Sequence, residues 1–279
     1  QPAAGDAGGA LGVALSIWHQ MLGNERVTNG KDSMRGAYLG PVFDDDEVAA
    51  FVDARGYKAH LLSDPEWAPR IAQLIDEQNV VGLMNGRMEF GPRALGGRSI
   101  LGDARSSEMQ SVMNLKIKYR ESFRPFAPSC LEERVSEFFE LDRPSPYMVL
   151  VAPVKQDRCT EEATTDEAAM RDRINAVRSD IPAITHVDNS ARIQTVSRET
   201  NPRYYDLIKA FEDRTGYGIL INTSFNVRGE PIVCTPEDAY RCFMRTEMDC
   251  LVVGSHLFLK AEQPEFCDKG DWRNDYVLD

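Results

Sequence analysis

The sequence predicts an α/β fold, because short apolar segments alternate with amphipathic helical segments along most of its 279 residues. Buried strands are expected at 80–84, 217–222 and 249–253, and strands also at 147–154 and 191–197. With 42% hydrophobic residues, the chain can bury the core of one large domain or two modest ones. In such folds a ligand site is expected at strand ends and in loops.

Helix signals begin with Gly5, where a glycine-rich turn leads into an apolar helix through about His19. The start of that helix could hold a phosphate, or it could simply be a tightly packed small-residue helix. Acidic residues 44–47 begin a helix that ends at Gly56. Asp64 begins the next helix and is followed by a proline at the first helical position. Residues 57–64 between them are the predicted domain junction.

The later helices are placed by the same signals. Helical spacing covers 107–118, and Pro202 begins a helix through about Arg214. Ser129 with Glu132 predicts a capping box for a helix through residue 139, and Thr235 predicts the cap of a helix ending near residue 245. The charged stretch 157–180 has few large apolar residues and is expected to be an exposed helix or an insertion.

The distribution of charge indicates an anion pocket. Residues 87–124 hold eight basic and four acidic side chains, a balance of +4, whereas the whole chain is −12, so the remainder sums to −16. A positive region in an acidic protein favours a small anion over nucleic acid, which usually requires a broader basic face. The alternative is that these side chains form solvated ion pairs on the surface.

Other classes of protein are disfavoured by composition. No apolar run approaches the roughly 20 residues that span a bilayer, and the first residues lack the basic and apolar regions of a signal peptide. The six cysteines form no C-x-x-C pair and the four histidines are dispersed, so neither a disulfide framework nor a metal cluster is expected. We therefore expect reduced thiols and a cytoplasmic location, with no membrane partner.

Three segments carry candidate site residues. Residues 85–100 crowd glycines, whose backbone N–H groups can approach a ligand closely, beside the arginines Arg87, Arg93 and Arg98. In 116–128 Lys118 and Arg120 alternate, so an extended chain would place them on one face. In 222–231 the polar side chains of Ser224, Asn226 and Arg228 alternate after a buried strand, which favours a ligand site over a purely structural turn.

Four segments together resemble a known family. GRMEFGPRALGGRSIL, IKYRESFRPFAPS, HVDNSARIQTV and NTSFNVRGEPIVCTPEDA, in this order and spacing, are similar to the carboxy-terminal half of the O-carbamoyltransferases that modify nodulation factors and antibiotics. The resemblance spans about residues 64–262. It implies a YrdC-like domain over 64–279, with a twisted mixed β-sheet flanked by helices. Residues 1–63 then resemble the end of a Kae1-like domain of the ASKHA type.

The resemblance also implies a reaction in two steps. The YrdC-like domain would form carbamoyladenylate from carbamoyl phosphate and ATP, with Mg²⁺ bridging the ATP phosphates. The Kae1-like domain would then transfer the carbamoyl group to a hydroxyl of a small molecule. By position in the family motifs, some residues would act on the phosphate and carbamoyl oxygens, namely Arg93, Lys118 and Arg120. Others would bind substrate and nucleotide, namely Arg87, Arg192, Ser224, Asn226 and Arg228.

One departure from the family pattern concerns the transfer site. In the family, a histidine pair spaced H-x-x-x-H and the aspartate of a GDAGG turn hold Fe²⁺ or another divalent metal. This sequence has that aspartate, Asp6, but no H-x-x-x-H. We therefore expect an upstream Kae1-like domain or a partner chain to supply the transfer site, and this chain alone to make carbamoyladenylate without carbamoylating an acceptor.

Two alternatives remain open at this point. A threonylcarbamoyladenylate synthase, which acts in tRNA modification, shares the fold and the adenylate chemistry, although the segments GPRALG and FRPFAPS argue against it. A noncatalytic nucleotide-binding module is the other alternative, since fold resemblance alone does not establish activity.

Overall fold

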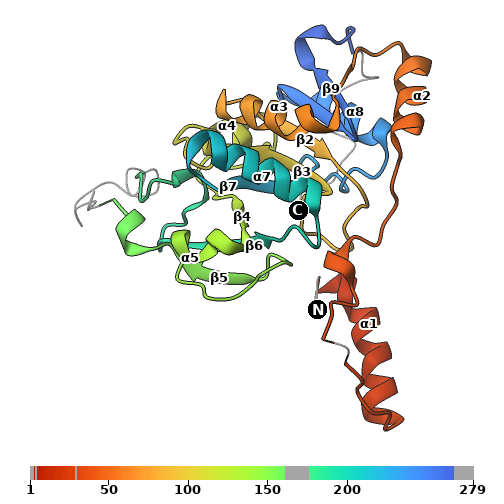
Figure 1. Ribbon diagram of the computed structural model, residues 1–279, viewed down its shortest axis with the longest axis vertical. Coiled ribbons are helices and arrows are strands. Elements are labelled where there is room, and N and C mark those ends of the chain that lie inside the picture. Colours follow the sequence, from red (N-terminus) through yellow and green to blue (C-terminus); the bar gives the residue numbers. More distant parts are fainter. Residues whose placement is uncertain (1–2, 4, 29, 161–175, 267–279) are drawn as a thin grey trace.

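A nine-stranded mixed sheet forms the centre of the computed structural model, which describes residues 3, 5–28, 30–160 and 176–266 (Figure 1). Its order is β1-β9-β8-β2-β3-β7-β4-β6-β5. The β2–β8 and β4–β6 pairs are parallel and the other pairs are antiparallel. The strands are β1 His60–Leu61, β2 Val81–Met84, β3 Arg98–Gly102, β4 Ala127–Leu131, β5 Leu150–Pro153, β6 Ser190–Val196, β7 Ile219–Ser224, β8 Cys250–Val253 and β9 His256–Leu259. The predicted mixed α/β fold is confirmed.

Helices cover both faces of the sheet. On one face α3 and α7 pack through a core that contains Trp67, Ile71 and Phe211. On the other face a second core joins α2, α4, α5 and α8 to the sheet. The helices are α1 Asp6–Ser16, α2 Asp45–Arg55, α3 Asp64–Asp76, α4 Met109–Lys116, α5 Val135–Phe138, α7 Pro202–Thr215 and α8 Pro236–Arg245. No helix in the described ranges combines the length and apolarity that crossing a membrane requires.

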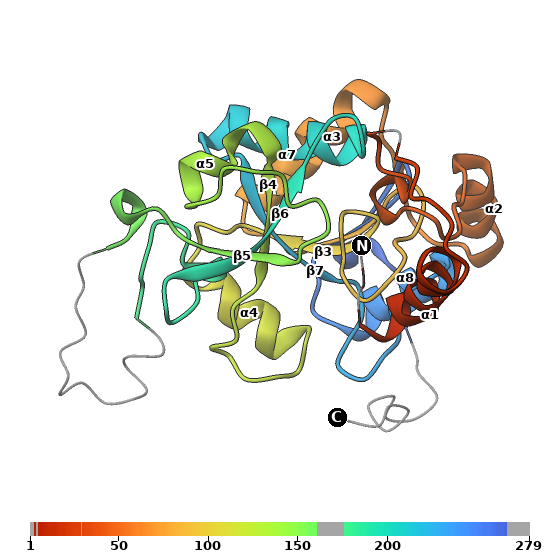
Figure 2. The same cartoon turned by 90° about the horizontal axis from the view of Figure 1, so that it is seen from below.

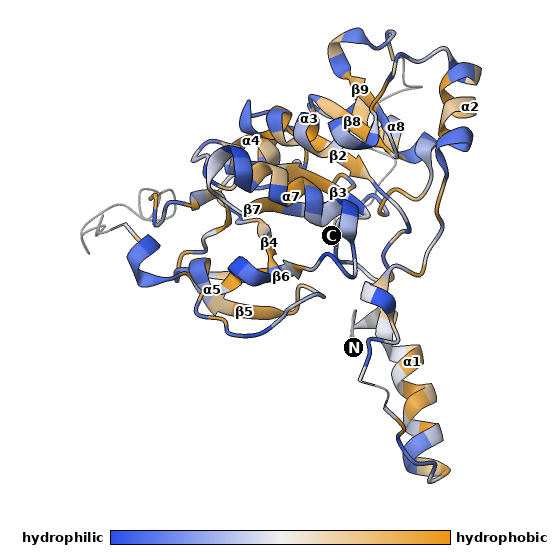
Figure 3. Cartoon of the chain, in the orientation of Figure 1, coloured by the Kyte–Doolittle hydropathy of each residue, from blue (hydrophilic) through white to orange (hydrophobic). Residues whose placement is uncertain are grey.

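Helix α1 projects away from the sheet and its helices (Figure 1). A π-helical turn, Ile17–Met21, continues it. Its apolar residues are open to solvent, as the hydropathy colours show (Figure 3): Trp18 is 53% exposed and Met21 79% exposed. Asp6 is the first residue of α1, so its predicted metal role, which depends on its side chain, lies outside what the structure describes.

Most predicted elements are present, and their ends follow the expected capping chemistry. The Asp44 carboxylate accepts a hydrogen bond from the Glu47 N–H, and α2 ends at Gly56, whose φ of 66° suits a residue without a side chain. The Thr235 hydroxyl likewise accepts from the Asp238 N–H at the start of α8. Predictions that rest on local side-chain to backbone bonds are therefore confirmed at these two helices.

One predicted helix cap and the predicted set of strands need correction. The capping box at Ser129 is wrong, because Ser129 lies inside β4 and its hydroxyl donates to Gln194 Oε1 at 2.5 Å. Strands β3 and β4 were not predicted, and β9 follows β8, which corresponds to the last predicted strand, 249–253.

Two further predictions concern the ends of the domains and a charged stretch. The stretch 157–180 falls mostly outside the described residues. Strand β1 lies within 57–64 and pairs with β9, while the division into domains 1–63 and 64–279 stays a prediction.

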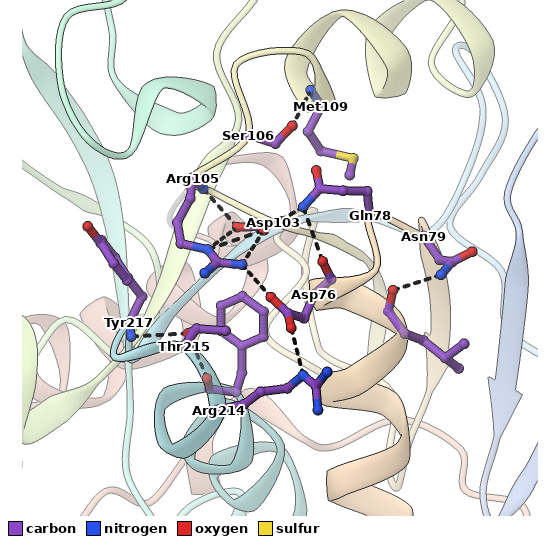
Figure 4. A network of polar contacts seen from close by, with 12 residues as sticks. Asp76, Gln78, Asn79, Asp103, Arg105, Ser106, Met109, Arg214, Thr215 and Tyr217 are labelled. Atoms are coloured by element: carbon purple, nitrogen blue, oxygen red, sulfur yellow. Dashed lines mark hydrogen bonds and ion pairs between the residues drawn. The ribbon is translucent and has the colours of Figure 1, made fainter.

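A partly buried ion-pair network joins helices α3 and α7 to the loop after β3 (Figure 4). Arg105 donates to both oxygens of Asp103 and, at 2.7 Å, to Asp76 at the end of α3. Arg214 of α7 donates to the other oxygen of Asp76 at 2.6 Å. The Arg105 guanidinium also lies 5.1 Å from the ring centre of Phe211. Hydrogen bonding to Arg105 lowers the pKa of Asp76, so the network favours the charged forms.

Removing Arg105 should destabilise the fold, because Asp103 is only 1% exposed and would lose its counter-ion. We expect Arg105→Leu to lower the free energy of unfolding by about 2–3 kcal/mol, measured by urea denaturation. The control is Arg143→Leu, since Arg143 is exposed and pairs with exposed Asp142; we expect a change under about 0.5 kcal/mol. Equal effects of the two substitutions would contradict this account.

Candidate functional site

The candidate residues gather at one end of the sheet because of how its strands are paired. The last residue of β2, Met84, lies opposite Arg98 at the start of β3. Ser224, at the end of β7, lies opposite Ser99. Ala127, at the start of β4, lies opposite residue 222 of β7. Segments 85–98, 118–127, 190–192 and 224–230 therefore meet at this end, where Figure 2 shows β3, β4, β6 and β7 side by side.

A buried glutamate organises the glycine-rich segment. One oxygen of Glu89 accepts hydrogen bonds from the N–H groups of Leu95 and Gly97, both at 2.7 Å. The N–H of Arg98 donates to both oxygens of the same carboxylate. These three backbone donors are therefore occupied by a protein carboxylate, so the expectation that glycine N–H groups here bind a ligand is wrong for Gly97, the one glycine among them. What the loop presents to solvent is its arginine side chains.

Arg98 is the exception among the arginines of this loop, because its side chain is buried. It is 0% exposed, and its guanidinium donates to the carbonyls of Gly86, Gly97 and Pro41 at 3.0–3.2 Å. A longer bond of 3.5 Å reaches the carbonyl of Cys234. Burial lowers the pKa of Arg98, while the nearby Glu89 carboxylate acts in the opposite direction. Arg98 therefore holds segments of the chain together rather than facing a ligand.

Arg93 and Arg192 form the clearest candidate for anion binding. Arg93 is exposed, and no hydrogen bond or ion pair to it is found in the described ranges. Arg192 of β6 is partly buried; its Nε has no hydrogen-bond partner among the described residues, and its Nη2 lies 3.9 Å from the Met148 sulfur. Burial lowers the pKa of Arg192, and the nearby positive charge of Arg93 lowers it further. Two guanidinium groups near enough for the charge of one to lower the pKa of the other suit a multiply charged anion.

A cavity of about 430 Å³ adjoins Arg192. Arg124 and Arg192 both line it, together with Phe126, His186, Asp188 and Ser190. Arg124 was not among the predicted site residues. The sequence feature that could have indicated Arg124 is its place between Phe123 and Pro125 in the predicted basic segment. The cavity is large enough for a nucleotide-sized ligand by the usual size of such pockets.

Lys118 anchors the turn after β7. Its ammonium donates to the backbone carbonyls of Ser224 and Asn226 at 2.5 and 2.8 Å, and to Asn226 Oδ1 at 2.9 Å. Burial lowers the pKa of Lys118 to about 7, although these acceptors favour the charged amine. The structure places this lysine as a support for Ser224 and Asn226, and its predicted contact with phosphate stays a prediction.

Arg120 contacts α4 and the chain just before β4. Its Nε donates to Asn114 Oδ1 at 2.6 Å, and its guanidinium lies 4.8 Å from the ring centre of Phe126. Burial and the nearby Arg124 lower the pKa of Arg120 to about 10. The expectation that Lys118 and Arg120 share one face of an extended strand is wrong, because Tyr119 between them has a φ of 48°. A turn therefore separates the two cations.

The remaining predicted residues lie in the turn after β7 and in the glycine-rich loop. Within the turn, the Ser224 hydroxyl donates to Asn226 Oδ1 at 2.7 Å, and Asn226 Nδ2 donates to the carbonyl of Glu230. Arg228 is exposed at the tip of this turn. Arg87 is exposed and donates to the carbonyl of Gly40 at 3.0 Å. In the part of the chain that the structure describes, no three histidine, cysteine or acidic residues are grouped as a metal site.

Stability measurements separate a ligand-facing cation from a supporting one. We expect Arg93→Ala to change the free energy of unfolding by less than about 0.5 kcal/mol, because Arg93 is exposed and repelled by Arg192. Lys118→Ala should cost about 2 kcal/mol or more, since buried carbonyls lose their donor. Urea denaturation of both variants measures this contrast, and a reversed order of the two costs would contradict the assigned positions.

Comparison with known proteins identifies the family of the chain. The family model described as Carbamoyltransferase C-terminus matches residues 72–260. An uncharacterized protein of Synechocystis is 57% identical over 100% of this chain, which covers 46% of that relative. The nodulation protein NolO of Bradyrhizobium diazoefficiens is 43% identical over 93% of this chain and 44% of the relative.

The chain spans about half the length of these relatives. Among solved structures, full-length HypF in its phosphate- and nucleotide-bound form has a TM-score of 0.45 at 15% identity, covering 71% of this chain and 22% of that one. The family match covers the arginine-rich loop, the lysine anchor and the turn after β7 together. The chain belongs to the carbamoyltransferase family and corresponds to its C-terminal region.

Proposed function

We propose that this chain carries out the activation step of an O-carbamoyl transfer, forming carbamoyladenylate from carbamoyl phosphate and ATP. The observation that carries the proposal is the cavity of about 430 Å³ that Arg124 and Arg192 line, with the positive charge of Arg93 near enough to lower the pKa of Arg192. Both substrates are polyanions, and bringing them together requires their charge to be neutralised at one place. Family membership supports the carbamoyl group as the one transferred.

The atoms of the step balance with one water. Water cleaves carbamoyl phosphate into carbamate and inorganic phosphate, and a carbamate oxygen then forms a bond to the α-phosphorus of ATP. The bond from that phosphorus to the bridging oxygen breaks, so pyrophosphate leaves with its electron pair. In this scheme Arg93 holds the phosphate of carbamoyl phosphate, and Arg192 with Arg124 holds the nucleotide phosphates. Fixed cations of this kind stabilise the charge that develops on transferred phosphorus.

The turn after β7 would supply orientation rather than charge. Lys118 fixes both Ser224 and Asn226 through their backbone carbonyls, so their polar side chains keep one geometry at the end of the sheet. Such fixed groups raise the rate by placing the reacting atoms, with no need to reorganise during the reaction. Arg228, exposed at the tip of the turn, and Arg87 remain proposed contacts to nucleotide and substrate.

The binding of metal ions stays a prediction. Mg²⁺ would accompany the ATP phosphates and neutralise part of their charge. The transfer metal would need ligands from an upstream Kae1-like domain or a partner chain, in addition to Asp6. Because the described residues offer no group of three metal ligands, we assign no step to a protein-bound metal. The acceptor of the carbamoyl group would be a small hydroxylated molecule, such as an antibiotic or another natural product.

ATP–pyrophosphate exchange that depends on carbamoyl phosphate tests the proposal. We expect exchange with the wild-type chain and a loss of about 100-fold in Arg93→Ala and Arg192→Ala, because each removes a donor to a charged phosphate oxygen. Arg143→Ala, at an exposed arginine that does not line the cavity, is the matched control and should exchange normally.

Two outcomes would contradict the proposal. Nucleotide binding without any exchange would indicate a noncatalytic module. Exchange that requires L-threonine and bicarbonate instead of carbamoyl phosphate would indicate a threonylcarbamoyladenylate synthase. Carbamoylation of an acceptor by this chain alone would overturn the expectation that another domain supplies the transfer site.

A further inference from the structure

A short segment from the first part of the chain, residues 37–41, lies along the glycine-rich loop; we call it the strap. The N–H of Gly40 donates to the carbonyl of Met88, and the N–H of Met88 donates back to the carbonyl of Pro41, both at 2.9 Å. The N–H of Phe90 donates to the carbonyl of Ala37 at 2.7 Å. The strap thus pairs antiparallel with residues 88–90, immediately before Arg93.

The Tyr38 hydroxyl extends this pairing across the loop. It donates to the carbonyl of Leu95 at 2.6 Å and accepts from Asn201 Nδ2 at 3.1 Å. Asn201 also caps α7, so the hydroxyl links the loop to a helix that is packed on the sheet. Burial raises the pKa of Tyr38, which keeps the hydroxyl protonated and able to donate at physiological pH.

Leu95, two residues after Arg93, is held at both of its backbone polar groups. Its N–H donates to Glu89, and its carbonyl accepts from Gln194 of β6 at 2.9 Å in addition to Tyr38. The carbonyl of Ala94 accepts from Asn222 of β7 at 2.9 Å. Of these contacts, the bond from Tyr38 is the one made by the strap, because the others come from the loop and the sheet. The direction in which Arg93 leaves the backbone therefore depends partly on the strap.

Apolar packing connects the strap to the second arginine. Ala37, Leu95 and Met148 are buried together as a small cluster, with 0%, 2% and 2% exposure. The Met148 sulfur lies 3.9 Å from Arg192 Nη2. A displacement of Ala37 would therefore disturb the surroundings of both Arg93 and Arg192.

Two arginines of the loop also bind the strap. Arg87 donates to the carbonyl of Gly40, and the buried Arg98 donates to the carbonyl of Pro41 at 3.2 Å. At Gly40 a Cβ atom would lie 2.9 Å from Met88 Cβ and 3.0 Å from the Met88 carbonyl oxygen. The strap and the loop therefore approach each other too closely at Gly40 for a larger side chain.

We infer that the strap positions the Arg93–Arg192 pair, and that Tyr38 is the positioning residue. The inference rests on the proposed function for its kinetic consequence, although the contacts themselves do not. Tyr38 touches neither substrate in this scheme; it acts through Leu95 on Arg93. Because the strap belongs to the predicted first domain, residues 1–63, movement of that part of the protein would reach the activating site through these contacts.

Tyr38→Phe is the sharpest test, because it removes one hydroxyl and keeps the ring. The 279-residue chain is assayed by carbamoyl-phosphate-dependent ATP–pyrophosphate exchange. We expect the KM for carbamoyl phosphate to rise about threefold to tenfold, the size that one hydrogen bond supports, with kcat changed less than about twofold. The matched control is Tyr205→Phe, whose hydroxyl binds Glu133 at the surface and should leave both constants unchanged.

Amide hydrogen exchange measures how firmly the loop is held, and it does not depend on enzymatic activity. In Tyr38→Phe, and more strongly in Gly40→Ala, the amides of Leu95, Gly97 and Arg98 should exchange faster, while amides in β8 keep their rates. If wild-type protein shows no carbamoyl-phosphate-dependent exchange, the proposed function fails but the amide rates still test the strap. Unchanged amide rates in both variants, or an unchanged KM in an active Tyr38→Phe enzyme, would overturn the inference.

Discussion

The site depends on one interaction, the buried Glu89 carboxylate that collects the backbone N–H groups of Leu95, Gly97 and Arg98. Without it, three donors would lie buried and unpaired in a glycine-rich loop, at a cost of about 1–3 kcal/mol each. The carboxylate turns a flexible segment into a defined loop. The loop lies at the end of the sheet, where the side-chain amides of Asn222 and Gln194 donate hydrogen bonds to its carbonyls, and Arg93 then projects from a rigid base.

The positive residues at this end of the sheet divide into two groups by what surrounds them. Arg98 and Lys118 are buried, and most of their donors are directed at oxygen atoms of the chain itself, although Arg98 Nε has no partner among the described residues. Arg93 is exposed, and the partly buried Arg192 has an Nε without a partner in the described part of the chain. The first group supports the backbone, and the second leaves positive charge available for a ligand. With this division, the proposed anion site would not need to rearrange on binding.

Much of the fold follows from local signals in the sequence. The apolar run that became β2 and the cap at Thr235 depend on neighbouring residues, so they could be predicted directly. Strand β4 was missed because its proline and serine are typical of a loop, and its place is set by β6 and β7 on either side. Ser129 illustrates the same limit: its hydroxyl binds Gln194, a residue 65 positions away, instead of capping a nearby helix.

The sequence by itself determined the family, the mixed α/β class and the segments that carry the site, because motifs and periodicity are properties of neighbouring residues. It also placed Arg93, Lys118 and Arg192 among the important cations. Only the tertiary structure decided which groups of the chain each cation contacts. Lys118 and Ser224, for example, are 106 residues apart and meet through the pairing of β7 with the strands beside it. The effect of the Arg93 charge on Arg192, and the hydrogen bond from Tyr38 to the loop that carries Arg93, arise from the same long-range packing.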